Sequence, residues 1–520
     1  MGISRSIAKN TLFNFITTAT DAAVSFIVSI LLARGLGTEQ YGLYSFLMWF
    51  LSLSALVVNL GLGEMTRRYI AEAIGQGNRE TPTGIVQMTL LIRGSASVLL
   101  SLLIIGLSSY LTKAFSEVNN SNVYFMLVAL VLFPNVMVDA IASIFAGFQK
   151  YEYSAYCGLV MSPLRLVGII ILMALGYGVT EILIMTAILF FIGLCYTILY
   201  LRRLVPIRAL VSKSTLEPAV RKDALKYSLT FIGIQGVTYF LWSQAEVLFL
   251  GLYTSAESIA FYNLAFKIPH MCISLIPFVL GRVLLPTVAE QYGKGDMGKV
   301  KAIYVSSARY LMMLTFPLVA GGIALASPII HGLYGLEYQP SVALMQIVFI
   351  PFSLMGLIHA STSVIYGINK PAFILKTGIV VIIVTIGLYL WMIPRYGVMG
   401  AAIASSVPRI AVFPIYNYYV YKKIGVHWPI SDSIRVVLAS VITGAAAYGI
   451  QRFFGGLPGL VVAILSGVLI YFLALLVFGF MTSLEISLLR KAEKRFPSAI
   501  RGKYSSIVNL VETFARKDSV

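Results

Sequence analysis

The stretch that decides the fold is TLFNFITTATDAAVSFIVSILLARGLGTEQYGLY, residues 11–44. It joins an apolar run to a glycine-rich hinge and a second apolar run, and roughly 20 apolar residues cross a bilayer. Four polar residues of the first run recur at helical spacing and share one face: Asn14, Thr18, Asp21 and Ser25. Because a central carboxylate costs a lipid-spanning helix roughly 3 kcal/mol, we expect this face to line a wet interior.

Composition extends this interpretation to the whole chain. Its 520 residues are 58% hydrophobic and 12% charged, whereas a soluble domain carries roughly 25% charged residues. We therefore predict an all-α polytopic membrane protein of about 14 transmembrane helices. The predicted spans are 11–33, 41–63, 84–109, 123–147, 155–175, 180–201, 227–251, 259–283, 303–326, 341–366, 374–394, 398–421, 433–452 and 458–480.

The distribution of basic residues predicts the orientation. The net charge is +18, and most Lys and Arg fall in the N-terminus, the even-numbered loops and the tail. This asymmetry follows the positive-inside rule and places both termini in the cytoplasm of a cell-membrane protein. The basic excess then reflects topology and contact with membrane lipids, so we expect no nucleic-acid partner. The three cysteines show no disulfide or metal spacing.

Several short motifs recur in the same order at an offset of 218 to 220 residues. They are Ala71-Glu72-x-x-Gly75-x-Gly77 with Ala289-Glu290-x-x-Gly293-x-Gly295, Gly147-x-x-Lys150 with Gly367-x-x-Lys370, and Tyr177-Gly178-Val179 with Tyr396-Gly397-Val398. Such a repeat indicates a duplicated architecture. Because each copy has an even number of spans, the two copies are predicted to be parallel.

The repeat predicts the domain organisation. We expect two six-helix lobes, two helices outside the duplication and a basic cytoplasmic tail. The boundaries are 1–201 for the first lobe, 202–226 for a basic cytoplasmic linker, 227–421 for the second lobe, 422–480 for helices 13 and 14, and 481–520 for the tail. The tail fits either an amphipathic helix on the inner membrane surface or a solvated segment.

A family resemblance follows from the hinge. The sequence Leu32-Ala33-Arg34-Gly35-Leu36-Gly37, with Glu39 and Tyr41-Gly42 after it, resembles the opening of Wzx-like polysaccharide and lipid-linked oligosaccharide flippases. These belong to the multidrug/oligosaccharidyl-lipid/polysaccharide exporter superfamily. The resemblance implies a V-shaped pair of lobes that work by alternating access. It also implies a polyprenyl- or dolichyl-(pyro)phosphate-linked oligosaccharide as substrate.

Polar residues inside the spans are the candidate substrate site. A guanidinium binds phosphate oxygens through two parallel hydrogen bonds, so intramembrane cations suit a phosphate, and amide, imidazole and indole groups suit sugars. The candidates are Arg93, Arg165, Lys267, Arg409, Gln235, Trp242, Asn263 and His270. The alternative for the three arginines is that they reach the lipid headgroups from span ends.

Intramembrane carboxylates suggest coupling to an ion gradient. The coupling candidates are Asp21, Asp139, Glu246 and His359, and the coupling ion would be H+ or Na+. Structural ion pairs between helices are the alternative for the three acids. In span 7, we expect Gln235, Tyr239, Trp242 and Glu246 to form one helical stripe.

Missing motifs separate the possible functions. The sequence contains no P-loop and no metal-binding motif, so we expect a secondary transporter without a cofactor rather than an enzyme. The alternatives are an H+- or Na+-coupled multidrug antiporter and, more remotely, a membrane glycan polymerase or ligase. We expect a monomer whose partners are the lipid-linked oligosaccharide, membrane lipids and other membrane proteins of glycan assembly.

Overall fold

The computed structural model describes residues 2–59, 61–78, 80–118, 121–206, 210, 216–481 and the isolated positions 486, 490, 505, 508, 509 and 512. Side chains in these ranges are described except at 2–15, 234, 241, 242 and 274–283. The described residues contain 10 helices that are long and apolar enough to cross a membrane. The chain is therefore a helical, multi-pass membrane protein, as composition predicted.

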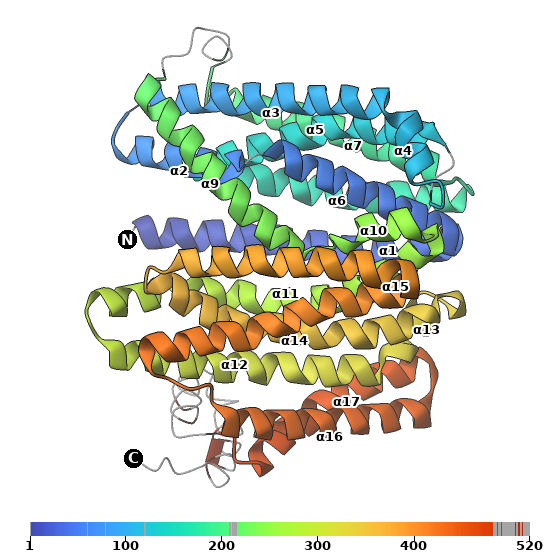
Figure 1. The fold of residues 1–520 in the computed structure, drawn as a ribbon, viewed down its shortest axis with the longest axis vertical. Coiled ribbons are helices and arrows are strands. Elements are labelled where there is room, and N and C mark those ends of the chain that lie inside the picture. Colours follow the sequence, from blue (N-terminus) through green and yellow to red (C-terminus); the bar gives the residue numbers. More distant parts are fainter. Residues whose placement is uncertain are drawn as a thin grey trace. The chain divides into compact units, whose positions relative to one another are not determined.

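The chain divides into two compact units, of which the first comprises Met1–Asn263 and Gly378–Ala401. Its helices are α1 Gly2–Asn59, α2 Leu62–Gly75, α3 Glu80–Gly106, α4 Ser108–Ala114, α5 Asn122–Gly147, α6 Tyr151–Ala174, α7 Val179–Leu201, α9 Pro218–Trp242 and α10 Glu246–Tyr253. Helices α3, α5 and α7 lie side by side (Figure 1). Helix α1 packs along α6, and this contact positions the polar stripe of α1.

The hinge predicted in the opening stretch is present. Gly37 has φ 74° and ψ 177°, so α1 is two helical segments joined at this residue. Glycine adopts this conformation without the steric penalty that a Cβ would bring. Gly42 serves a different purpose, because a Cβ there would lie 1.8 Å from the carbonyl oxygen of Ala256. Because Gly42 has no side chain, α1 can pass close to the backbone at Ala256.

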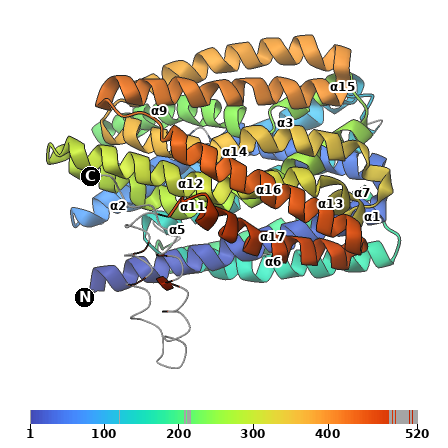
Figure 2. The same ribbon diagram turned by 90° about the horizontal axis from the view of Figure 1, so that it is seen from below.

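The second unit comprises Leu264–Thr377 and Ala402–Val520. The remaining helices are α11 Ala256–Gly293, α12 Met297–Ala324, α13 Ala326–Leu333, the 3₁₀ turn η1 Leu336–Tyr338, α14 Pro340–Gly367, α15 Pro371–Ile424, α16 Ile430–Phe454 and α17 Gly456–Val477. Helix α15 is interrupted at Gly397, with φ 54° and ψ −134°. Helices α16 and α17 form a hairpin beside α12 (Figure 2).

Ionic contacts attach this hairpin to α12. Arg309 Nε lies 3.1 Å from a carboxylate oxygen of Asp432 at the start of α16. The same guanidinium donates to the carbonyl of Phe480 at 2.9 Å, and Arg435 donates to the carbonyl of Gly479 at 3.1 Å. Both ends of the hairpin are therefore held near one cluster of charges.

The recurring motifs coincide with helix ends. Gly77 and Gly295 have φ 73° and 74°, two residues after the ends of α2 and α11. The following residue donates its backbone N–H to a carbonyl five residues earlier in both places, at 3.0 Å. This is the pattern of a helix stopped by a left-handed glycine.

The second motif pair behaves in the same way without glycine at the left-handed position. Gln149 and Asn369 both have φ 57°, 220 residues apart, after α5 and α14. Lys150 and Lys370 then close the turn with backbone hydrogen bonds of 2.8 and 3.0 Å. Two of the three sequence matches are therefore matched helix-stop signals; in the third, Gly178 precedes α7 with φ −101°, whereas Gly397 lies within α15 with φ 54°.

The prediction of a single span over 227–251 is wrong in one respect. Helix α9 ends at Trp242, and Glu246 begins a separate helix, α10. Ser243 has extended backbone angles between them, so Glu246 does not continue the stripe of Gln235 and Tyr239. The predicted tail helix after residue 481 lies mostly outside the described residues.

Candidate functional site

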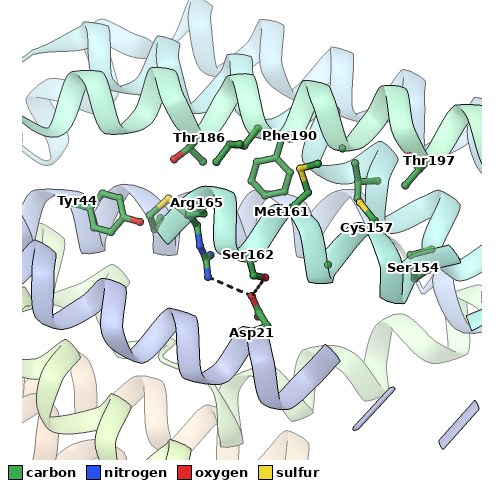
Figure 3. A pocket seen from close by; sticks show the side chains of 16 residues that line it. Asp21, Tyr44, Ser154, Cys157, Met161, Ser162, Arg165, Thr186, Phe190 and Thr197 are labelled. Carbon is green, nitrogen blue, oxygen red and sulfur yellow. Dashed lines mark hydrogen bonds and ion pairs between the residues drawn. The ribbon is translucent and has the colours of Figure 1, made fainter. Parts of the chain in front are cut away.

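A cavity of about 300 Å³ lies inside the first unit, among α1, α5, α6 and α7 (Figure 3). Its walls are mainly apolar and include Met48, Met161 and Phe190. Two charged side chains, Asp21 and Arg165, also line it. The cavity thus combines apolar walls with a single ion pair, an arrangement typical of small-ligand sites.

The ion pair joins α1 to α6. Arg165 Nη2 lies 3.3 Å from Asp21 Oδ1 and donates to Ser25 Oγ at 2.8 Å. Ser162 donates to the same Asp21 oxygen at 3.1 Å (Figure 3). Asp21 and Ser25 are one helical turn apart, so the stripe predicted on the first span is the face that α6 contacts.

A second pair joins α3 to α5 in the same unit. Arg93 Nη2 lies 2.6 Å from Asp139 Oδ2. The Arg93 side chain is 1% exposed, so it does not extend along the surface towards headgroups. Two predicted phosphate ligands, Arg93 and Arg165, therefore belong to separate interhelical ion pairs.

The carboxylate side chains of both ion pairs are more than half exposed. The side chains of Asp21 and Asp139 are 58% and 54% exposed, although both lie within long apolar helices. Charged groups at membrane depth face water-filled space or protein rather than lipid. The two aspartates are therefore expected to face water-filled space rather than lipid.

Glu246 has a different environment. It is 0% exposed, and Tyr262 and Tyr389 donate hydrogen bonds to its two oxygens, the second at 3.0 Å. Sequence reasoning missed both tyrosines. The repeat contained a signal for one of them, since Tyr262 stands 218 residues after Tyr44, which lines the cavity of the first unit.

In the second unit, Arg409 and His270 share two aromatic neighbours. The Arg409 guanidinium lies 5.5 Å from the ring centre of Phe266 and 6.0 Å from that of Phe352. The His270 ring lies 5.7 Å from both. Arg409 is 4% exposed, so this cation is buried and stabilised in part by ring faces.

The remaining candidates are dispersed. Asn263 accepts a hydrogen bond from Tyr41 at 3.4 Å. Gln235 on α9, Lys267 on α11 and His359 on α14 are half-buried. The side chain of Trp242 lies outside the described residues. Within the described part of the chain, no three His, Cys, Asp or Glu side chains gather as a metal site.

The family profile of polysaccharide biosynthesis proteins matches residues 7–291, more than half of the 520 residues. The chain therefore belongs to this family, which confirms the resemblance found at the hinge.

Curated relatives are distant. The probable flippase AglR of Haloferax volcanii is 24% identical over 247 residues, which cover 40% of this chain and 49% of that relative. The chain thus spans about half the length of this curated relative. Stage V sporulation protein B of Bacillus subtilis is 22% identical over 508 residues, covering 91% of this chain and 96% of that protein.

Two solved structures share the fold. The lipid II flippase MurJ in an inward closed conformation has a TM-score of 0.71 at 15% identity, covering 89% of this chain and 98% of its own. An inward-facing multidrug resistance MATE family transporter has a TM-score of 0.62 at 17% identity, covering 77% and 95%. At these identities the likeness concerns the fold alone.

Proposed function

We propose that this protein is a flippase that moves a polyprenyl- or dolichyl-(pyro)phosphate-linked oligosaccharide across the cell membrane by alternating access. The observation that carries the proposal is the guanidinium of Arg165 at a cavity among membrane-spanning helices. A guanidinium recognises phosphate through paired hydrogen bonds. The relative named as a probable flippase and the fold shared with the lipid II flippase MurJ support a flippase with a lipid-linked cargo.

The helix lengths support 14 crossings. Helix α1 contributes 44 residues to its apolar stretch, about 66 Å at 1.5 Å per residue, which is twice the roughly 30 Å hydrocarbon core. Helix α15 has 54 residues, and like α1 it is interrupted at a glycine. If α1 and α15 each cross twice, the 10 long helices give 12 crossings, and one crossing each by α9–α10 and α11 brings the total to 14.

The matched helix ends support two parallel six-helix repeats followed by α16 and α17. The even number of crossings and the basic inner loops support cytoplasmic termini. We expect a monomer that contacts membrane lipids and other membrane proteins of glycan assembly. Transport is secondary and needs no cofactor, with H+ or Na+ as the coupling ion.

The coupling candidates are unequal. Asp21 and Asp139 are open and paired with arginine, whereas Glu246 is enclosed by tyrosine hydroxyls. A carboxylate open to water exchanges an ion more easily than an enclosed one. Asp21 is therefore the first residue to test, and Asp21→Asn is expected to change the ion dependence of transport.

The test is depletion of the protein in its own cells. We expect lipid-linked oligosaccharide to accumulate on the cytoplasmic face, and restoration of the chain to clear it. Lys267→Ala and Arg409→Ala are expected to restore it poorly although the protein inserts. Full clearance by both variants would remove these two cations from the cargo path.

The second candidate is an H+- or Na+-coupled multidrug antiporter, favoured by the MATE fold and an acid in the first span. It predicts no accumulation on depletion and altered sensitivity to cationic drugs. The same depleted cells therefore decide between the two functions.

A further inference from the structure

We infer that Asp21 is a built-in counter-ion, which the phosphate of an anionic ligand displaces from Arg165. The ligand class is a phosphate or diphosphate ester, including the diester that joins a lipid to a sugar, and the inference rests on the proposed function for its physiological source. It assigns different roles to the two arginine–aspartate pairs of the first unit: one exchanges its anion, and the other holds helices together.

The Arg165 guanidinium is incompletely used. Its hydrogen bonds to Asp21 and Ser25 of α1 both involve Nη2. Its Nε has no hydrogen-bond partner among the described residues. Strong arginine–anion recognition uses two parallel N–H groups, whereas the present contacts use only Nη2; because Nε is buried, a larger anion must approach the Nη side of the guanidinium.

The ion pair is also weak by geometry. Its 3.3 Å separation exceeds the 2.7–2.9 Å typical of charge-assisted hydrogen bonds. Half-exposed pairs of this kind contribute only about 0–1 kcal/mol. A diphosphate diester carries two negative charges against one for a carboxylate, and its several oxygens can accept from more than one N–H group of the guanidinium, so it should compete well for Arg165.

Asp21 can leave Arg165 at low cost. Its side chain is 58% exposed, so the released carboxylate can be hydrated. Ser162 donates a hydrogen bond to it independently of Arg165, at 3.1 Å. Displacement therefore does not create the buried, unpaired charge that makes most intramembrane ion pairs costly to open.

The second pair shows what a fixed contact looks like. Arg93 lies 2.6 Å from Asp139 and its side chain is 1% exposed. Arg93 also has N–H groups without partners in the described structure, but these nitrogens are buried. Arg165 is 32% exposed and lines the 300 Å³ cavity. Access to a ligand distinguishes the two arginines.

The test uses inorganic diphosphate and the purified full-length protein. Calorimetry gives the affinity of the wild type, Asp21→Asn and Asp139→Asn. Removing a competing anion should strengthen diphosphate binding by about tenfold in Asp21→Asn, the equivalent of 1.4 kcal/mol. Asp139→Asn should bind like the wild type, and Arg165→Leu should lose the binding.

A second measurement locates the bound anion. Cys157 lines the same cavity, so a variant with Cys195→Ser and Cys272→Ser leaves it as the single thiol. Diphosphate should slow its reaction with a small methanethiosulfonate, and should do so at lower concentration in Asp21→Asn. Binding without this protection would place the anion elsewhere and overturn the inference.

The outcomes separate this inference from the proposed function. Unchanged or weaker binding in Asp21→Asn, equal strengthening in Asp139→Asn, or no binding at all would overturn the counter-ion role. The depletion experiment would still test whether the protein flips a lipid-linked oligosaccharide. Tighter binding in Asp21→Asn without accumulation in depleted cells would instead preserve the exchange and refute the glycan-flipping function.

Discussion

The two units each contain a cavity, and the cavities differ in charge. One cavity of the first unit, about 300 Å³, is lined by Asp21 and Arg165. That of the second, about 640 Å³, lies among α11, α12, α14, α16 and α17 and has no charged residue in its described lining. Its hydroxyl groups are satisfied by backbone carbonyls: Tyr471 donates to Met313 O of α12 at 2.8 Å, and Thr443 donates to Ala439 O of its own helix at 2.8 Å.

The difference follows from which helices form the walls. The charged cavity lies where α1 and α6 turn polar faces towards each other. The apolar cavity lies where α16 and α17, outside the predicted duplication, pack on α12. A cavity lined only by apolar side chains stays dry. A cavity in a membrane protein therefore becomes a polar site only where polar side chains of a helix face it.

Placing a carboxylate in each cavity should give the largest effect. Thr186 and Thr443 are matched positions, because both are buried and donate to the carbonyl four residues earlier. Thr443→Asp should destabilise the protein by about 3 kcal/mol or more, since no described cation lines that cavity. Thr186→Asp should cost less because Arg165 lines the same space. Thermal unfolding in one detergent compares them, and equal losses would contradict the distinction.

Filling the charged cavity should impair transport. A Cβ at Gly193 would lie 3.8 Å from Cys157 Sγ and from a Val138 methyl, so a longer side chain occupies the cavity without a backbone clash. Gly193→Leu should slow clearance of lipid-linked oligosaccharide by about tenfold, a loss of 1.4 kcal/mol. Gly193→Ala is the control and should remain active. Normal clearance by both variants would show that cargo does not need this cavity.

Thiol labelling tests whether the charged cavity is hydrated and the apolar cavity is dry. Cys157 lines the charged cavity and Cys272 the apolar one. Two single-cysteine variants, both with Cys195→Ser, retain either Cys157 or Cys272. Their rates of reaction with a charged methanethiosulfonate should differ severalfold, and Cys157 should react faster. A membrane-soluble maleimide should label Cys272 as well. Faster reaction of Cys272 with the charged reagent would mean that its cavity is hydrated.

The smallest effect is expected at Gly467. A Cβ there would meet a Thr443 methyl at 3.6 Å, an ordinary contact in the apolar cavity. Gly467→Ala should stabilise the protein by about 0.5–1 kcal/mol, because glycine is a poor helix former, and should leave transport unchanged. Thermal unfolding measures the gain. A drop in transport at unchanged stability would assign a function to the apolar cavity.

Much of the architecture could be predicted because its signals are local. The interruption at Gly37, the shared face of Asp21 and Ser25, and the recurring helix ends near Gly77 and Gly295 all depend on neighbouring residues. Glycine at a left-handed position and polar residues at helical spacing act over one or two turns. A single sequence contains all that is needed to recognise them.

The pairings could not be predicted in the same way. Arg165 and Asp21 are 144 residues apart, and four intramembrane cations offered many possible partners. The helix break before Glu246 could not be predicted either, because the Trp242–Glu246 spacing also fits a continuous helix. Where the backbone bends and which stripes meet depend on packing between distant segments.

The sequence by itself determined that the chain is a polytopic helical membrane protein with a hinged first helix, because hydropathy and glycine conformation are properties of short segments. Only the tertiary structure decided that the Arg93 side chain is buried in its ion pair with Asp139, whereas the Arg165 side chain lines a cavity. The physical reason is that the exposure of a charge, and hence what it can bind, is set by the helices packed around it.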